Sequence, residues 1–297
     1  MSTWKPLEGV HIVSLALNLP GPAALMRLCA MGARCSKVAW GDDPMLHYSS
    51  TAFEAMHDGV ELHQINLKTP QGQAALDALL QTADVLLTSF RAQALVKLKL
   101  DEAALRMRHP HLSSVSIFGA LGLGANEAGH DLTYQAQHGL LGDLQLPSTL
   151  MADMAGALCA SEAVLSLVLG QARARADGKA WVGQHLQVGL SESAQFMAQP
   201  LTWGLTTPGT VLGGAHAGYR VYCAQDGRVA LAALEPHFWA HWCQAVGWAS
   251  EGDVMPSPTS AETAQRVADA MATQTCAHWA ELAARHDIPL HVLPNAG

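Results

Sequence analysis

The sequence predicts an α/β fold: a Rossmann-like parallel sheet with flanking helices in a large domain, and a smaller α+β C-terminal domain. In the first part of the 297-residue chain, short apolar, β-branched runs alternate with helical patterns, as in repeated βαβ units. Beyond residue 205, a hairpin pattern and three helical patterns replace this alternation. We therefore expect a large domain over residues 1–205 and a small domain over residues 206–297.

The first βαβ unit is the clearest. Val10–Leu17 is a short apolar run that ends at the breaker cluster Asn18–Pro22. Ala23–Met31 has a helical pattern, and Gly32 stands where a C-terminal cap is expected. Cys35–Trp40 then predicts a second strand, which closes the unit.

The pattern repeats along the large domain. Thr69 and Pro70 provide the N-cap and the first-turn proline of the next helix. The pattern over 95–108 leaves open one helix or two. The further strands expected here are 62–67, 84–90, 111–119 and 183–188, and the further helices are 72–82, 95–108, 153–175 and 193–205.

The small domain begins after Thr206–Thr210, which has the composition of a linker. Tyr219–Cys223 and Arg228–Leu234 flank the turn signal Gln225-Asp226-Gly227, so they predict a hairpin. The remaining elements expected are helices over 236–246, 261–273 and 277–286 and a strand over 289–293.

The composition excludes several classes of partner. Charged residues make up only 14% of the chain and the net charge is −8, so the concentrated basic surface that nucleic acids or anionic membranes need is absent from the sequence. At 49% apolar residues, the chain is also too apolar for a disordered protein. The N-terminus lacks a signal-peptide pattern, the most apolar stretch (154–170) falls short of a membrane span, and the six cysteines form no Cys-x-x-Cys pair. We expect a cytoplasmic protein with reduced cysteines.

Familiar nucleotide and hydrolase motifs are missing. Asn18–Pro22 has one glycine where a dinucleotide fingerprint needs three, and the sequence has no phosphate-binding Gly-x-x-x-x-Gly-Lys motif. Gly189–Ser193 lacks the last glycine of a serine-nucleophile elbow. His237 and His241 are spaced as two ligands on one helix face, but no third ligand accompanies them, so we expect no metal site.

Three residues are acid/base candidates. His130 follows a glycine-rich loop over 119–129, Asp153 begins the long apolar helix, and Glu235 precedes Pro236 at another helix start. Free backbone N–H groups at a helix start can hold a developing oxyanion. The ordinary reading stays open for each: an acid at a helix start is most often an N-cap, and a single histidine is more often structural than catalytic.

Taken together, several segments resemble family III CoA-transferases, specifically the racemase branch of that family. They follow the family's order and spacing over nearly the whole chain. The segments are Pro6–Val10, Gly21-Pro22, Met31–Val38, Asn66–Gly72, Ala83–Arg91, Gly129-His130-Asp131 with Tyr134, Ala152–Gly156 and Leu234–Phe238.

The resemblance implies a catalytic role for the three acid/base candidates. Asp153 matches the catalytic carboxylate of both branches, which is a nucleophile in the transferases and one of two bases in the racemases. His130 matches the second base, and Glu235 matches a residue that orients it. The expected reaction is reversible α-proton transfer on a 2-methylacyl-CoA thioester through an enolate, as part of lipid metabolism. It needs no cofactor beyond the coenzyme A of the substrate.

Coenzyme A binding is also implied by position. In the family, the matching segments contact the nucleotide and pantetheine, and Lys68, Arg91 and Lys97 are expected to face phosphates. These three are otherwise ordinary surface charges. The predicted binding residues are Leu19, Pro20, Asn66, Leu67, Lys68, Ser89, Phe90, Arg91, Lys97, Gly129, Asp131 and Tyr134.

The chain departs from the family pattern at three places. Ala39 and Trp40 stand where an acidic residue and a phosphate-binding arginine are usual, Met56–Val60 replaces an Asn-Arg-Gly-Lys segment, and the small domain is shortened, ending at Gly297. Two alternatives therefore stay open beside the racemase: CoA transfer through Asp153, and a non-catalytic binding or assembly subunit. The family also implies a homodimer, interlocked or not, with Glu235 acting within its own chain or across the dimer.

Overall fold

The computed structural model describes residues 4–41, 43–122, 124, 127–142, 144–250 and 253–294. The chain divides into two compact units, Met1–Ala198 and Gln199–Gly297. The division falls before the 205/206 boundary expected from the sequence, so the last part of the predicted large domain belongs to the second unit.

The first unit contains a six-stranded parallel sheet of order β3-β2-β1-β4-β5-β6. Its strands are β1 (His11–Ser14), β2 (Arg34–Ala39), β3 (Glu61–Gln64), β4 (Val85–Thr88), β5 (Ser113–Phe118) and β6 (His185–Gly189). The order reverses between β1 and β4, and the loops after these strands diverge there, where open α/β sheets bind ligands. The predicted Rossmann-like fold is confirmed.

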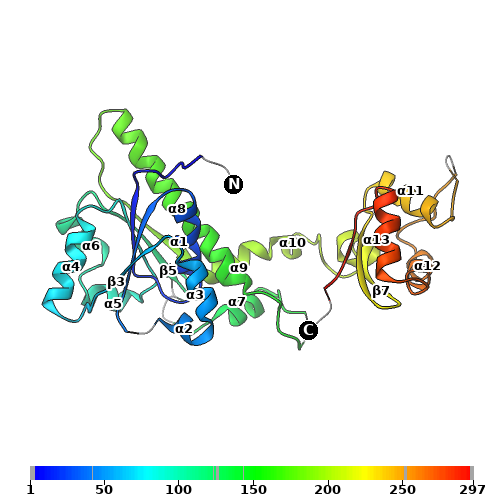
Figure 1. Ribbon diagram of the computed structural model, residues 1–297, viewed down its shortest axis with the longest axis horizontal. Helices are drawn as coiled ribbons and strands as arrows, with labels where there is room; N and C mark the ends of the chain where they lie inside the picture. Colours follow the sequence, from blue (N-terminus) through cyan, green and yellow to red (C-terminus); the bar gives the residue numbers. More distant parts are fainter. Residues whose placement is uncertain are drawn as a thin grey trace. The chain divides into compact units, whose positions relative to one another are not determined.

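Helices cover both faces of this sheet, with α4 and α6 on one side and α1 and α8 on the other (Figure 1). The helices of the unit are α1 (Pro20–Ala30), α2 (Pro44–Tyr48), α3 (Ser50–Met56), α4 (Pro70–Leu80), α5 (Ala92–Lys97), α6 (Glu102–Arg108), α7 (Asp131–Gln137), α8 (Met151–Ala176) and α9 (Leu190–Met197).

The central strands are buried on both faces, which explains their continuous apolar sequence. In β1, Ile12 packs into the cluster formed with α1 and α8, whereas its neighbour Val13 packs into the opposite cluster with α4 and α6. In β4, Leu87 and Leu86 divide between the two clusters in the same way. A shift of one residue in register would exchange the two faces.

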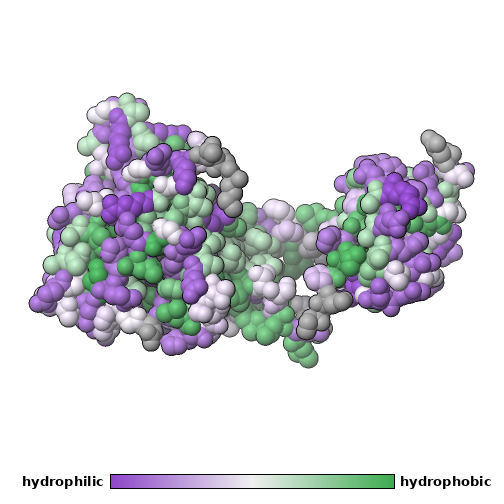
Figure 2. Space-filling view, in the orientation of Figure 1, coloured by the Kyte–Doolittle hydropathy of each residue, from purple (hydrophilic) through white to green (hydrophobic). Residues whose placement is uncertain are grey.

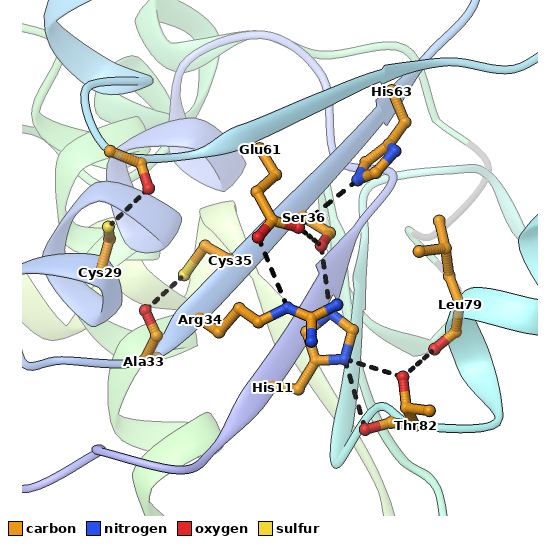
Figure 3. A network of polar contacts seen from close by, with 11 residues as sticks. His11, Cys29, Ala33, Arg34, Cys35, Ser36, Glu61, His63, Leu79 and Thr82 are labelled. Atoms are coloured by element: carbon orange, nitrogen blue, oxygen red, sulfur yellow. Dashed lines mark hydrogen bonds and ion pairs between the residues drawn. The ribbon is translucent and has the colours of Figure 1, made fainter.

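The amino ends of β1–β3 are joined by a polar network (Figure 3). The His11 ring lies 3.1 Å from Ser36 Oγ, and that hydroxyl donates to Glu61 Oε2 at 3.1 Å. Glu61 also lies 3.6 Å from the Arg34 guanidinium. Burial lowers the pKa of His11, with Arg34 contributing, which favours the neutral imidazole. The network is therefore a structural link between strands, at the end of the sheet opposite the ligand-binding loops.

Helix α8 spans 26 residues and is long and apolar enough to cross a membrane by length and composition, contrary to the sequence expectation. Its buried side chains include Ala160, Val164 and Leu167, which belong to the same core cluster as β1 and α1. This position in the core of the unit accounts for its apolar sequence.

The second unit is built around a three-stranded antiparallel sheet of order β7-β8-β9. Trp239, Trp242 and Trp279 form the centre of its own core. Its elements are α10 (Gln199–Thr202), the short helical turn η2 (Val211–Ala215), β7 (Tyr219–Ala224), β8 (Gly227–Ala232), α11 (Pro236–Ala245), α12 (Ala261–Met271), α13 (Cys276–Arg285) and β9 (Leu290–Val292).

The single helix predicted over 193–205 is wrong, because α9 ends at Met197 and α10 begins at Gln199, next to Pro200, which has no backbone N–H to donate. Over 95–108, where the pattern left one helix or two open, the structure has two helices, separated at Lys99 with φ of 56°. Helices α2 and α3, which the sequence pattern does not predict, are short and are capped by Asp43 and Ser49.

A buried ion pair holds the segment after β2. Lys37 is fully buried, with its ammonium 3.1 Å from the Asp43 carboxylate and donating to the Ala16 carbonyl. Burial lowers the pKa of Lys37, and Asp43 opposes this shift. The other oxygen of Asp43 accepts from the backbone N–H of Met45. The pair thus joins β2, the loop after β1 and the start of α2.

Replacing either partner alone is expected to leave an uncompensated buried charge. We expect Lys37→Met to lower the free energy of unfolding by about 3–5 kcal/mol, measured by urea denaturation. The double variant Lys37→Met/Asp43→Asn is expected to lose less than the sum of the two single changes. Additive losses would show that the two groups do not stabilise each other.

Candidate active site

The candidate site forms where α7 meets the start of α8. His130 is the N-cap residue of α7 and is exposed, whereas Asp131, the first residue of the helix, is only 6% exposed. The Thr133 hydroxyl accepts a hydrogen bond of 3.0 Å from the His130 backbone N–H and donates to its carbonyl. The start of α7 is therefore fixed, and it holds His130 at the protein surface.

Asp131 links the two helices. Its Oδ1 accepts a hydrogen bond of 3.0 Å from the backbone N–H of Asp153, and its Oδ2 accepts one of 2.5 Å from the Gln135 side chain. The first N–H groups of an α-helix have no partner within the helix, so Asp131 satisfies one of them at the start of α8. Asp131 is among the predicted binding residues, and in the structure its carboxylate caps α8.

Asp153 is the electrostatic centre of the site. It lies half-buried in the first turn of α8, and burial, followed by repulsion from Asp131, raises its pKa to about 6. Within the described part of the chain, no hydrogen bond to its carboxylate is found. A carboxyl group with a pKa near 6 takes or gives a proton readily at neutral pH, which suits both acid/base and nucleophilic roles.

Tyr134 stands next to this carboxyl group and is buried. Its hydroxyl lies so close to Gly119 and Gly129 that a Cβ on either glycine would be 2.2 Å and 2.6 Å from the hydroxyl oxygen, respectively. Burial first, and then the charges of Asp153 and Glu192, raise the Tyr134 pKa, while Arg91 opposes the shift. The two glycines thus make room for the phenol of Tyr134.

Several of the predicted coenzyme A residues lie in the loops at the carboxyl edge of the sheet. Leu19 and Pro20 begin α1 after β1, whereas Ser89, Phe90 and Arg91 follow β4, and Lys97 ends α5. The Ser89 hydroxyl accepts a hydrogen bond of 2.8 Å from the backbone N–H of Leu17, so it bridges the two loops at the switch point. Arg91 and Lys97 are exposed.

The third binding segment follows β3. Asn66 Oδ1 accepts from the backbone N–H of Lys68 at 3.0 Å, and the Asn66 carbonyl accepts from Thr69. A Cβ on Gly72 would lie 1.9 Å from that carbonyl, so only glycine fits. Leu67 packs against the α4 side of the core. Lys68 extends to the ring of Trp40, with its ammonium 4.7 Å from the ring centroid.

Glu235 lies in the second unit, where it is the exposed N-cap residue of α11. Its predicted pairing with His130 stays a prediction. Glu192 is a further residue of the site that the sequence does not predict: it accepts from the backbone N–H of Leu121 at 3.0 Å and contributes to the raised pKa of Tyr134. It lies within Gly189–Ser193, the segment compared with a serine elbow, where Ser191 is buried and hydrogen-bonded to His138.

Two further features from the sequence are the glycine-rich loop over 119–129 and the pair His237 and His241. Around residues 119–129, positions 123, 125 and 126 of the glycine-rich loop lie outside the described residues. No cluster of three or more histidine, cysteine or acidic side chains positioned to hold a metal ion occurs among the described residues. His237 and His241 have ring centroids 6.1 Å apart, in an edge-to-face arrangement.

Together, a doubly wound parallel sheet and a carboxyl group of raised pKa define an α/β protein with a candidate acid–base site. The model of CoA-transferase family III matches residues 7–296, and the chain belongs to this family.

The similar proteins include one named as a racemase and one named as a CoA-transferase. The α-methylacyl-CoA racemase of Homo sapiens is 30% identical over 299 residues, covering 93% of this chain and 74% of the relative. The succinate–glutarate CoA-transferase of Agrobacterium fabrum is 29% identical over 273 residues, covering 82% of this chain and 66% of the relative.

The solved structures agree on the fold. The crystal structure of a CaiB/BaiF family protein from Brucella suis superposes with a TM-score of 0.80 at 24% identity, covering 99% of this chain and 85% of the other. A crystal structure of Rv3272 from Mycobacterium tuberculosis gives a TM-score of 0.81 at 24% identity, covering 98% and 84%.

The raised pKa of Asp153 has a consequence for stability. Because its folded-state pKa lies above the ordinary value of 3.8, the ionised carboxylate destabilises the folded protein. That cost is fully present above pH 6 and disappears as the pH falls toward 3.8. We expect Asp153→Asn to raise the free energy of unfolding by about 1–3 kcal/mol at pH 8, and by about a third of that at pH 4.5.

Urea denaturation at the two pH values measures this difference. Glu162→Gln is the matched control, because Glu162 is an exposed acid on the same helix and its replacement is expected to change stability by less than about 0.5 kcal/mol. Equal effects of Asp153→Asn at both pH values would contradict a raised pKa.

Proposed function

We propose that the protein is a racemase or epimerase of 2-methylacyl-CoA thioesters that moves the α-proton through an enolate. The observation that carries the proposal is the bond between Asp131, the residue after the exposed His130, and the backbone of Asp153, whose carboxyl group has a pKa of about 6. Membership in CoA-transferase family III and 30% identity to a racemase support a CoA thioester as substrate.

The chemistry requires two groups of opposite protonation state. An α-proton beside a thioester is weakly acidic, so its removal needs a positioned base and stabilisation of the enolate oxygen. Inversion then needs an acid on the other face of the carbon. A neutral imidazole and a carboxyl group whose raised pKa keeps part of it protonated near neutral pH can perform these two roles and exchange them for the reverse reaction.

Other groups at the site support a developing negative charge. Asp153 lies in the first turn of α8, where the helix dipole is positive, and Arg91 is close enough for its charge to act on Tyr134. The pantetheine arm is proposed to follow the loops after β1 and β4, past Ser89, toward this point. In this arrangement Glu235 would orient the imidazole of His130.

CoA transfer is the second candidate function. A half-buried carboxylate of raised pKa is also a suitable nucleophile for an acyl group, and a CoA-transferase is among the relatives at 29% identity. A non-catalytic role as a binding or assembly subunit is the third, and the experiments below separate all three.

Isotope exchange tests the racemase. Incubation of one enantiomer of a 2-methylacyl-CoA with the enzyme in D₂O is expected to give both enantiomers, with deuterium at the α-carbon, measured by mass spectrometry and chiral chromatography. Asp153→Asn is expected to abolish inversion, with a loss of at least about 10³-fold, because one of the two faces loses its acid or base. Proton exchange without inversion is expected to persist on the face served by His130.

Glu162→Gln serves again as the control and is expected to keep the wild-type rate. If no acyl-CoA gains deuterium while CoA passes from an acyl-CoA to a free carboxylic acid, the protein is a transferase. If neither reaction occurs and Asp153→Asn changes only stability, the binding-subunit role is favoured.

A homodimer is proposed from the surface of the first unit. Hydrophobic residues gather on the part of this unit near α7 and α9 (Figure 2). The exposed apolar side chains include Leu158 on α8, 48% exposed, and Phe196 on α9, 64% exposed. Burying such side chains against a second copy would remove them from water.

Light scattering coupled to size exclusion is expected to give twice the chain mass of 31.4 kDa. Phe196→Glu is expected to shift the protein toward the monomer, because it places a charge on the apolar surface. Met107→Glu, at an apolar residue of α6 that is 80% exposed, is the control and is expected to leave the mass unchanged. A wild-type monomer at micromolar concentration would contradict the proposal.

A further inference from the structure

We propose that Trp40 and Lys68 form a stacking platform for the adenine ring of coenzyme A, with the indole holding the base and the lysine holding the adjacent phosphate. This inference rests on the proposed function, because it concerns the nucleotide end of the same CoA thioester. We refer to these two side chains as the Trp40–Lys68 platform.

The platform lies at the carboxyl edge of the sheet. Ala39 and Gln64 are the last paired residues of β2 and β3, and the backbone N–H of Ile65 donates to the Ala39 carbonyl at 2.8 Å just beyond them. Trp40 and Lys68 follow these two strands. Ligands of open α/β sheets bind at this edge, so both side chains stand on the binding side of the molecule.

The indole is exposed although a cation already covers part of it. The Lys68 ammonium lies 4.7 Å from the ring centroid, yet Trp40 remains 53% exposed. A surface cation–π pair contributes only about 0.5–1 kcal/mol in general, which does not explain why a tryptophan is left in water. Indole accepts a nucleobase on its face, and stacking of this kind tolerates any base because it uses the π surface alone.

Residues next to both side chains are held in place. Ala39, the residue before Trp40, accepts from the backbone N–H of Ile65, and Lys37 in the same strand forms the buried pair with Asp43, in which the ammonium and carboxylate lie 3.1 Å apart. The turn that carries Lys68 is closed by the hydrogen bond from its backbone N–H to Asn66 Oδ1. A platform that is already ordered loses little conformational entropy when a ligand binds.

The charge of the chain also favours stacking for this ligand. Coenzyme A is a polyanion, while the chain has 17 basic and 25 acidic residues and a net charge of −8. Few cations are therefore available for the phosphates. An aromatic contact provides binding energy to the adenine end without a further positive charge, and Lys68 is positioned to serve both the ring and a phosphate.

The test uses CoA and its fluorescent analogue 1,N⁶-etheno-CoA as probes. Isothermal titration with CoA is expected to show that Trp40→Ala raises the Kd by about 10-fold and that Trp40→Phe raises it by about 3-fold, because phenylalanine keeps a smaller π surface. Etheno-CoA fluorescence is expected to be quenched on the wild type by contact with the indole and to recover on Trp40→Ala. Tyr48→Ala, an 81% exposed aromatic on α2, is the matched control and is expected to keep the wild-type Kd.

Lys68→Met separates the charge from the stacking. The variant keeps an apolar chain over the ring and removes the ammonium. It is expected to bind CoA more weakly than the wild type at low salt, and this difference in Kd is expected to disappear at 0.5 M NaCl. Thermal unfolding of each variant shows whether it folds like the wild type.

The outcomes distinguish the platform from the proposed function. If Trp40→Ala binds CoA with the wild-type Kd and quenching, the platform is overturned while the proposed function stands. An equal loss in Trp40→Ala and Trp40→Phe also overturns the platform, because it shows that an aromatic face is not what the site uses. If the wild type binds no CoA, the proposed function and the platform fall together.

Discussion

The carboxylate of Asp131 accepts a hydrogen bond of 3.0 Å from the backbone N–H of Asp153, and the geometry of the candidate site follows from this contact. The bond caps the start of α8 and fixes α7 against it, so that His130, the residue before Asp131, is held near the first turn of α8. The same proximity of two acids contributes to the raised pKa of Asp153. One contact thus links Asp153 to the residue next to His130, its partner in the proposed acid–base pair, and Asp131 contributes to the raised pKa of Asp153.

The sheet determines where a ligand can lie. Strands β1 and β4 are buried on both faces, and their loops emerge at the carboxyl edge between two layers of helices, where the strand order reverses. The Ser89 hydroxyl joins the two loops by accepting from the Leu17 backbone. Arg91 follows β4 and is close enough for its charge to act on Tyr134, so the proposed path of the pantetheine arm and the candidate acid–base site belong to the same unit.

Much of the fold could be predicted from the sequence, because strands buried on both faces are continuous apolar runs and helix caps such as Thr69 are local signals. Tertiary interactions decided the rest. Helices α2 and α3 are short and depend on caps from Asp43 and Ser49, so they left little periodicity to detect. His130 and Asp153 were found as candidates from their neighbours in the sequence. The capping role of Asp131, the effect of Glu192 on Tyr134 and the contact between Lys68 and Trp40 join residues that sequence spacing does not relate.

The low number of basic residues limits how a polyanion can be held at the carboxyl edge of the sheet. A chain with a net charge of −8 that receives a polyanion must either concentrate its cations or use contacts that need none. The described cations at this edge include Lys68 after β3 and Arg91 after β4, and Lys68 lies over an exposed indole. Stacking on Trp40 would place the adenine where Lys68 can still reach a phosphate. In that arrangement a tryptophan, rather than an additional cation, holds the nucleotide end of the substrate, while Arg91 remains beside the reacting end.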